Sequence, residues 1–114
     1  MPPKTNPLRL NPLQCKTLAV LQALAQDESL SERDERSGDV RIVRFPHAHG
    51  EHFHIGEAVV MAKDASGLKN ESVWRALERK GLIRGDYPLS LRITPTGQEY
   101  DSGLADKVLR RAEH

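Results

Sequence analysis

Residues 70–83 read Asn-Glu-Ser-Val-Trp-Arg-Ala-Leu-Glu-Arg-Lys-Gly-Leu-Ile, and they constrain the architecture of this 114-residue chain more than any other segment. Asn70 is a favoured N-cap residue, so a helix is predicted to begin there. Val73 and Leu77 are four positions apart and share the face that is directed into the core. Gly81 ends the helix, and the apolar residues after it begin a strand. The segment therefore predicts a short amphipathic helix that leads directly into a sheet.

Three further elements are predicted upstream. Asn11 caps a first helix and is spaced from Gln14 as a capping box. The apolar face of this helix is wide enough for burial at the centre of the fold or against a second subunit. Residues 40–45 have alternating, β-branched character and predict a strand. Residues 56–65 predict a short helix, and a glycine-containing turn joins it to the helix that starts at Asn70, which gives a helix-turn-helix pair.

A hairpin and a final helix are predicted downstream. Residues 89–94 alternate apolar and polar side chains, so they form a second strand with one buried face and with Arg92 exposed. Thr96 and Glu99 are spaced as a capping box that opens the final helix. That helix carries four apolar residues on one face, namely Tyr100, Leu104, Val108 and Ala112.

This order of elements resembles the bacterial winged helix-turn-helix regulators of the MarR-like kind. The resemblance is carried by Ile55-Gly56-Glu57-Ala58, Ser66-Gly67-Leu68, Val73 to Ile83 and Leu91-Arg92-Ile93-Thr94-Pro95-Thr96-Gly97. It implies a single α+β winged-helix domain that consists of a helix, a strand, a helix-turn-helix, a two-stranded wing and a C-terminal helix. The domain would span residues 11–114 with an acidic loop at 27–39, and residues 1–10 would form a flexible N-terminal arm.

The side chains that this packing leaves free are candidate DNA contacts. Arg75 is the best candidate for a bidentate contact to guanine, and Arg84 and Arg92 on the wing would neutralise phosphates. Polar residues at the start of the helix would reach base edges or phosphates. The predicted DNA-binding residues are Lys69, Asn70, Ser72, Arg75, Arg79, Arg84 and Arg92. The alternative is that the same helix is one amphipathic face of a small domain that binds protein.

Charge is unevenly distributed along the chain. The formal net charge is only +1, but residues 27–39 hold six acidic side chains against two arginines. The remainder of the chain is therefore basic, which favours a polyanionic partner.

Cysteine and hydropathy patterns predict a cytoplasmic protein. The single cysteine, Cys15, excludes an internal disulfide and lies in an apolar helical pattern, so a buried, inert thiol is predicted. No apolar run approaches the roughly 18–20 residues that a membrane-spanning helix requires. The N-terminal residues lack the pattern of a signal peptide.

Four of the five histidines lie between residues 46 and 54. A two-residue hairpin turn at Gly50-Glu51 would place the two histidines before it opposite the two after it, with all four imidazoles on one side. These candidate zinc or nickel ligands are His47, His49, His52 and His54. Without a metal, the cluster would form a pH-sensitive surface. The His-x-His-x-Glu-His pattern is also similar to a motif of metallo-β-lactamase-fold hydrolases, but the chain is too short for that fold.

The sequence thus predicts a DNA-binding transcriptional regulator without enzymatic activity. We expect a homodimer formed through the first and last helices, and a response to metal or pH through the histidines. Two alternatives remain. One is a winged-helix protein–protein interaction module that does not bind DNA, and the other is a metal-binding protein that acts through the histidine ribbon.

Overall fold

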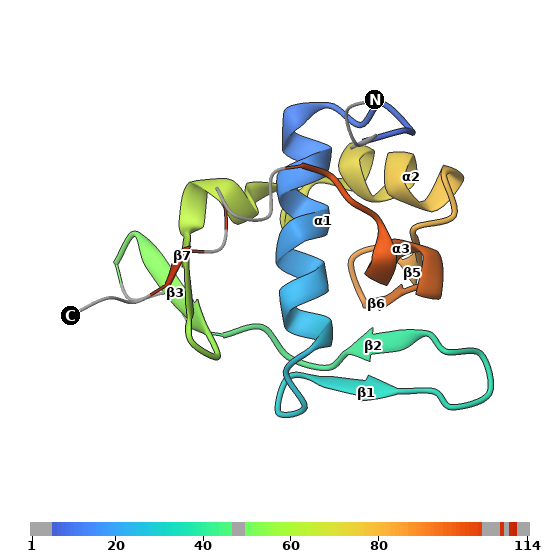
Figure 1. Cartoon of the computed structure of the whole chain (residues 1–114), viewed down its shortest axis with the longest axis horizontal. Coiled ribbons are helices and arrows are strands. Elements are labelled where there is room, and N and C mark those ends of the chain that lie inside the picture. Colours follow the sequence, from blue (N-terminus) through green and yellow to red (C-terminus); the bar gives the residue numbers. More distant parts are fainter. Residues whose placement is uncertain (1–5, 47–49, 104–107, 109, 112–114) are drawn as a thin grey trace, which may run out of the picture.

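The computed structural model describes residues 6–46, 50–103, 108, 110 and 111, which form a mixed α+β fold (Figure 1). The helices are α1 (Pro12–Ala25), the 3-10 helix η1 (Ala62–Lys69), α2 (Glu71–Arg79) and α3 (Pro95–Glu99). The strands are β1 (Ser31–Arg33), β2 (Val40–Ile42), β3 (His52–Ile55), β4 (Ala58–Met61), β5 (Ile83–Asp86), β6 (Ser90–Ile93) and β7 (Arg110–Arg111).

Helix α1 lies at the centre of the fold and contacts η1, α2, α3 and the larger sheet (Figure 1). The side chains of Asn11 and Gln14 form the predicted capping box at its N-terminus. Leu18, Leu21 and Leu24 are fully buried. Of the two interpretations of its wide apolar face, burial at the centre of one chain is therefore confirmed, and no second subunit is needed to cover this helix.

The larger sheet has the strand order β1-β2-β6-β5, and its neighbouring strands are antiparallel. Val40, Leu91 and Ile93 are buried on the face that is directed towards the helices. The β5–β6 hairpin forms where a two-stranded element was predicted. The prediction for Leu89 was wrong, because this residue lies in the turn before β6 begins at Ser90 and is 83% exposed.

The acidic segment 27–39 is a hairpin arm rather than a plain loop, because part of it forms β1 and pairs with β2. Strand β2 has three residues and ends earlier than the predicted strand at 40–45. The N–H groups of Val43 and Arg44 both donate to the carbonyl of Leu30, at 2.8 and 3.3 Å, which turns the chain away from the sheet.

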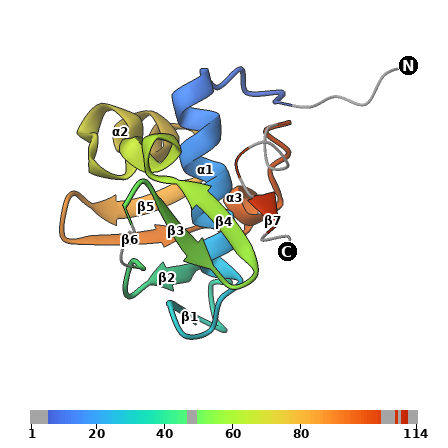
Figure 2. The ribbon, with the colours of Figure 1, turned by 90° about the vertical axis from the view of Figure 1, so that its left-hand side faces the viewer.

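A second sheet, with the order β3-β4-β7, replaces the helix that was predicted over residues 56–65. Gly56, with a φ of +58°, and Glu57 form the turn of the β3–β4 hairpin. Val59 and Val60 are β-branched and favour a strand, and the side chain of Val60 is fully buried. The apolar spacing that indicated a helix therefore belongs to a strand that contacts η1, and Figure 2 shows the β3–β4 hairpin face on.

The helical pair η1 and α2 begins later in the chain than predicted, and the connection between the two helices is shorter. η1 starts at Ala62, the predicted turn at 66–69 lies inside it, and Asn70 alone separates it from α2. Gly67 lets η1 approach α1 closely, because a Cβ atom at this position would overlap the hydroxyl of Thr17. The close contact fixes the position from which α2 starts.

The predicted final helix is shorter than its pattern indicated. α3 ends at Glu99, and its N-cap is Thr94, whose hydroxyl accepts from the N–H of Gly97; the predicted cap at Thr96 was wrong. Tyr100 leaves the helix in an extended conformation and is nearly buried. Val108 is buried. The predicted helix residues Leu104 and Ala112 lie outside the described residues.

Residues 6–10, which were predicted to belong to a flexible arm, are attached to the domain. The hydroxyl of Tyr100 donates to Asn6 Oδ1 at 2.6 Å and accepts from the N–H of Leu8 at 2.9 Å. Leu10 is buried, and Lys80 Nζ donates to the carbonyl of Leu8 at 2.9 Å. In the part of the chain that the structure describes, no helix is long and apolar enough to cross a membrane.

Candidate nucleic-acid interface

Three arginines form a row across the outer face of the larger sheet. Arg41 on β2 is paired in register with Arg92 on β6, and Arg92 is paired with Arg84 on β5. All three are exposed, because they alternate with the buried residues of their strands. Neighbouring strands are roughly 4.8 Å apart, so the three side chains leave the sheet side by side. We call these residues the arginine row.

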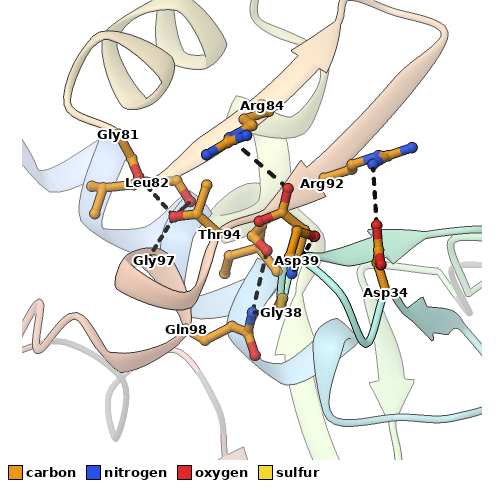
Figure 3. Close-up of polar contacts among 12 residues, drawn as sticks. Asp34, Gly38, Asp39, Gly81, Leu82, Arg84, Arg92, Thr94, Gly97 and Gln98 are labelled. Atoms are coloured by element: carbon orange, nitrogen blue, oxygen red, sulfur yellow. Dashed lines mark hydrogen bonds and ion pairs between the residues drawn. The ribbon is translucent and has the colours of Figure 1, made fainter.

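Like charges in direct cross-strand positions destabilise a sheet unless other groups balance them. Each member of the arginine row has its own carboxylate. Arg41 Nη2 lies 2.8 Å from Glu32 Oε2, and Glu32 itself extends the row on β1. Arg92 Nη1 lies 4.0 Å from Asp34 Oδ2, and Arg84 Nε lies 3.9 Å from Asp39 Oδ2 (Figure 3). The acidic segment therefore supplies the counter-charges of the row.

The β1–β2 turn holds Asp34 in its ionised form. The N–H of Arg36 donates to Asp34 Oδ1 at 2.9 Å. This hydrogen bond is the largest cause that lowers the pKa of the carboxyl, and Ser37 and the charge of Arg92 lower it further. Gly38, with a φ of +79°, closes the turn. The lowered pKa favours the charged form of the carboxylate that faces Arg92.

Asp39 is the most buried carboxylate near the row. Its residue is 2% exposed, and its Oδ1 atom has no hydrogen-bond partner among the described residues. Its Oδ2 atom faces only the distant guanidinium of Arg84, whose side chain is 70% exposed. Gln98 on α3 donates to the neighbouring carbonyl of Gly38 at 2.9 Å and helps to cover this end of β2 (Figure 3).

Two members of the row, Arg41 and Arg92, line a small polar hollow of about 220 Å³ together with residues of the acidic segment. It is lined by Glu32, Arg33, Asp34, Asp39, Arg41 and Arg92. Three arginines and three carboxylates face one another here, so an incoming anion would compete with side chains of the same chain for the guanidinium groups.

The predicted contacts on α2 lie on a separate face, and two of them already have partners. Arg75 binds Glu71 at 3.2 Å and Glu78 at 3.5 Å, and the hydrogen bond that it donates to Glu71 is the largest cause that raises the pKa of this guanidinium. Asn70 uses its side-chain oxygen to cap the N–H of Ser72 at 2.9 Å. Neither is as free to contact bases as predicted.

The remaining predicted DNA contacts are exposed. Ser72 and Arg79 lie on the solvent face of α2, and Lys69 ends η1 just before it. The prediction that Val73 and Leu77 face the core is confirmed, because both side chains are buried. α2 contacts β5, the edge strand that carries Arg84.

The structure therefore groups the predicted residues into two sets. Arg84 and Arg92 join the sheet face, whereas Lys69, Asn70, Ser72, Arg75 and Arg79 belong to α2 and the residues before it. Arg41 was missed by the sequence analysis. Strand alternation from Val40 to Ile42 shows that Arg41 is exposed, but the pairing of β2 with β6 brings it beside Arg92, and that pairing is not local.

Only part of the histidine cluster lies within the described residues. His52 and His54 share one face of β3, and their rings meet edge to face with centroids 5.1 Å apart. Their cross-strand partners on β4 are Met61 and Val59. His47 and His49, and with them the predicted four-histidine metal site, lie outside the described residues. Among the residues that are described, no group of three metal-ligating side chains occurs.

Comparison of the chain with protein-family models, with curated proteins and with solved structures finds no match, so the function is argued from the geometry alone.

Proposed function

We propose that this protein is a winged-helix DNA-binding regulator that holds duplex DNA through its arginine row and the solvent face of α2. The order of elements supports this proposal. α1, β2, η1, α2, β5 and β6 follow one another as the helices and strands of a winged helix do, and β6 lies between β2 and β5. The β3–β4 hairpin is then an insertion between the first strand and the helical pair.

The arginine row is the observation that carries the proposal. Two strand spacings separate Arg41 from Arg84, a distance of roughly 10 Å. Duplex DNA carries one phosphate charge for about every 1.7 Å of its axis, so a segment of this length presents about six phosphate charges. Three guanidinium groups in one line can bind several of these phosphates at once, each through two parallel hydrogen bonds.

The carboxylates of the acidic segment do not prevent this binding. The contacts of Arg84 and Arg92 are 3.9 and 4.0 Å long, at the outer limit of an ion pair. The Arg92–Asp34 and Arg41–Glu32 pairs are exposed on both sides, and pairs of this kind contribute at most about 1 kcal/mol and are weakened by salt. A phosphate can therefore replace these carboxylates, and the net affinity is expected to be modest and strongly salt-dependent.

The predicted homodimer was inferred from the wide apolar face of the first helix and from the amphipathic last helix. The face of α1 is covered within the chain, and most of the predicted last helix lies outside the described residues, so the proposed DNA contact is described for one chain. The predicted base contact by Arg75 would require its two glutamate partners to release it. We therefore propose that the affinity comes mainly from the DNA backbone.

The proposal is tested by fluorescence anisotropy with a labelled random duplex of about 20 base pairs at salt concentrations from about 50 to 200 mM. Each phosphate contact adds about 0.9 to the log–log salt slope, so Arg41→Ala/Arg92→Ala should lower that slope by up to about 1.8. Arg36→Ala is the matched control, because Arg36 is exposed in the β1–β2 turn outside the row. Binding that does not depend on salt, or an equal loss in both variants, would overturn the proposal.

A further inference from the structure

An apolar groove of about 910 Å³ lies on the side of α2 that is turned towards η1. Its walls come from four places: the chain after β2, strand β3, helices η1 and α2, and the turn between β5 and β6. The lining residues are Phe45, Pro46, Phe53, Ala62, Ala65, Ser66, Leu68, Lys69, Trp74, Tyr87 and Pro88. We call this feature the apolar groove.

Four of the five aromatic side chains of the protein line this groove. Trp74 and Tyr87 meet edge to face, with ring centroids 4.8 Å apart. Their polar atoms are already satisfied: Trp74 Nε1 donates to the carbonyl of Leu68 at 2.9 Å, and the hydroxyl of Tyr87 donates to the carbonyl of Lys69 at 2.7 Å. These two rings therefore offer an occupant apolar surface and no free hydrogen-bond donor.

The groove is accessible from solvent. Phe45 is 47% exposed, and Pro88 is exposed on the opposite side. A cavity of this size falls within the range of roughly 300–1,000 Å³ that small-molecule sites occupy. An apolar occupant of the groove would remove part of the exposed Phe45 side chain from water, which favours binding.

Lys69 carries the only charge among the lining residues that the structure describes. Its side chain is exposed, and within the described part of the chain its ammonium group has no ion-pair partner. Ser66, also on η1, adds a hydroxyl group near the same end of the groove. Among the described residues, the lining contains no carboxylate that could bind a cation. A single positive charge beside an apolar surface is complementary to a ligand with one negative group and an apolar body.

We propose that the apolar groove binds a small amphipathic carboxylate, whose hydrocarbon part lies against Phe45, Trp74 and Tyr87 and whose carboxylate pairs with Lys69. The hydrocarbon part supplies most of the affinity through burial, and Lys69 selects the anion. A polyanion fits this site less well than it fits the arginine row, because one lysine stands here where three guanidinium groups stand in the row.

Trp74 is the only tryptophan of the chain, so its fluorescence reports directly on this groove. We would titrate the full chain with octanoate, 4-butylbenzoate, 1-octanol and octylammonium, all below their micelle concentrations. Comparison of octanoate with 4-butylbenzoate shows whether the groove prefers a carboxylate with an alkyl chain or one with an aromatic ring. Saturable changes in emission are expected for the carboxylates, weaker binding for the alcohol, and the weakest for the cation.

Lys69→Gln should weaken binding of the carboxylates about two- to fivefold and leave binding of 1-octanol unchanged. Lys63→Gln is the matched control, because Lys63 lies on the same helix η1, is exposed and does not line the groove. Phe45→Ala should weaken all four ligands without unfolding the protein, since Phe45 is half exposed. Circular dichroism and the thermal midpoint confirm that each variant is folded.

Three results would overturn the proposal. They are an emission that no ligand changes in a saturable way, equal binding of octylammonium and octanoate, and an equal effect of Lys63→Gln and Lys69→Gln. The experiment contains no nucleic acid, so its outcome is independent of the function that we propose for the arginine row.

Discussion

Arg84 and Arg92 are direct cross-strand partners on β5 and β6, yet each guanidinium group faces a different carboxylate of the acidic segment. Asp34 and Asp39 lie at the two ends of the β1–β2 turn, and the N–H of Asp34 donates to the carbonyl of Asp39 at 2.8 Å. One turn thus positions both counter-charges. In the sequence, the acidic segment is only a run of charged residues. In the fold, its carboxylates compete with any bound anion for the guanidinium groups of the arginine row.

Asp34→Asn should strengthen binding of duplex DNA. The substitution removes the carboxylate that faces Arg92 at 4.0 Å and keeps a side chain that can accept from the N–H of Arg36. The affinity at about 50 mM salt should rise about two- to fivefold, and the log–log salt slope should become steeper by up to about 0.9. The measurement is the same anisotropy titration. Glu35→Gln is the control, because Glu35 is exposed in the same turn; an equal gain from this variant would show a general charge effect instead.

Arg84 and Asp39 should be coupled in stability. In Arg84→Ala the buried Asp39 carboxylate loses the guanidinium group that lies 3.9 Å from it, so the free energy of unfolding should fall by about 0.5–1 kcal/mol. The estimate stays small because the side chain of Arg84 is 70% exposed. In an Asp39→Asn background the same arginine substitution should have almost no effect. Urea titrations of the four proteins close this double-mutant cycle, and equal losses in both backgrounds would contradict the coupling.

Local signals in the sequence were sufficient to predict α2 and the first turn of α1. Asn70 caps α2, and Gly81 adopts a φ of +75° directly after it. The capping box of Asn11 and Gln14 forms as its spacing indicated. Each of these features depends on residues that are at most four positions apart, and hydrogen bonds over that distance are favourable whatever surrounds them.

Features that depend on tertiary pairing were not predictable in the same way. The apolar positions at 55, 59 and 62 fit a helix, but β-branched residues and the turn at Gly56 favour the β3–β4 hairpin. Arg41 became part of the candidate site only through the pairing of β2 with β6, which joins residues about 50 positions apart. Tyr100 ends α3 because its hydroxyl binds the N-terminal segment, and that contact has no local signature.

Gly67→Ala should destabilise the protein strongly. An alanine Cβ atom at this position would overlap the hydroxyl of Thr17 on α1, so η1 and α1 would have to move apart or the Thr17 side chain would have to shift. Overpacking of this kind costs about 1–3 kcal/mol. Thr17→Ala should restore part of the loss in the double variant, because it removes the atom in closest contact. Gly67→Ala is measured by urea unfolding, and a variant as stable as the wild-type protein would show that η1 does not need this close approach.

Tyr100 should make the stability fall at alkaline pH. Burial is the largest cause that raises the pKa of its hydroxyl above the ordinary value of 10.0, although the hydrogen bond from the N–H of Leu8 lowers it in part. Between pH 10 and the raised pKa, the folded chain keeps a proton that the unfolded chain has released. The free energy of unfolding must therefore decrease as the pH rises through this window, and below it the contribution is fully present.

Tyr100→Phe separates the effect of the Tyr100 hydroxyl from the effects of other groups that titrate at alkaline pH. At pH 7 the variant should lose about 0.5–1.5 kcal/mol for each of the two hydrogen bonds of the hydroxyl with Asn6 and Leu8. Above pH 10 its stability should decline less steeply than that of the wild-type protein. Burial also raises the pKa of the Cys15 thiol above its ordinary value of 9.0, so Cys15→Ala is the control. The stability of Cys15→Ala should begin to diverge from that of the wild-type protein about one pH unit below the pH at which Tyr100→Phe diverges, because the ordinary pKa of tyrosine is 10.0. Urea unfolding curves at several pH values between about 8 and 11 measure both slopes, and parallel curves for wild type and Tyr100→Phe would exclude the buried hydroxyl as the cause.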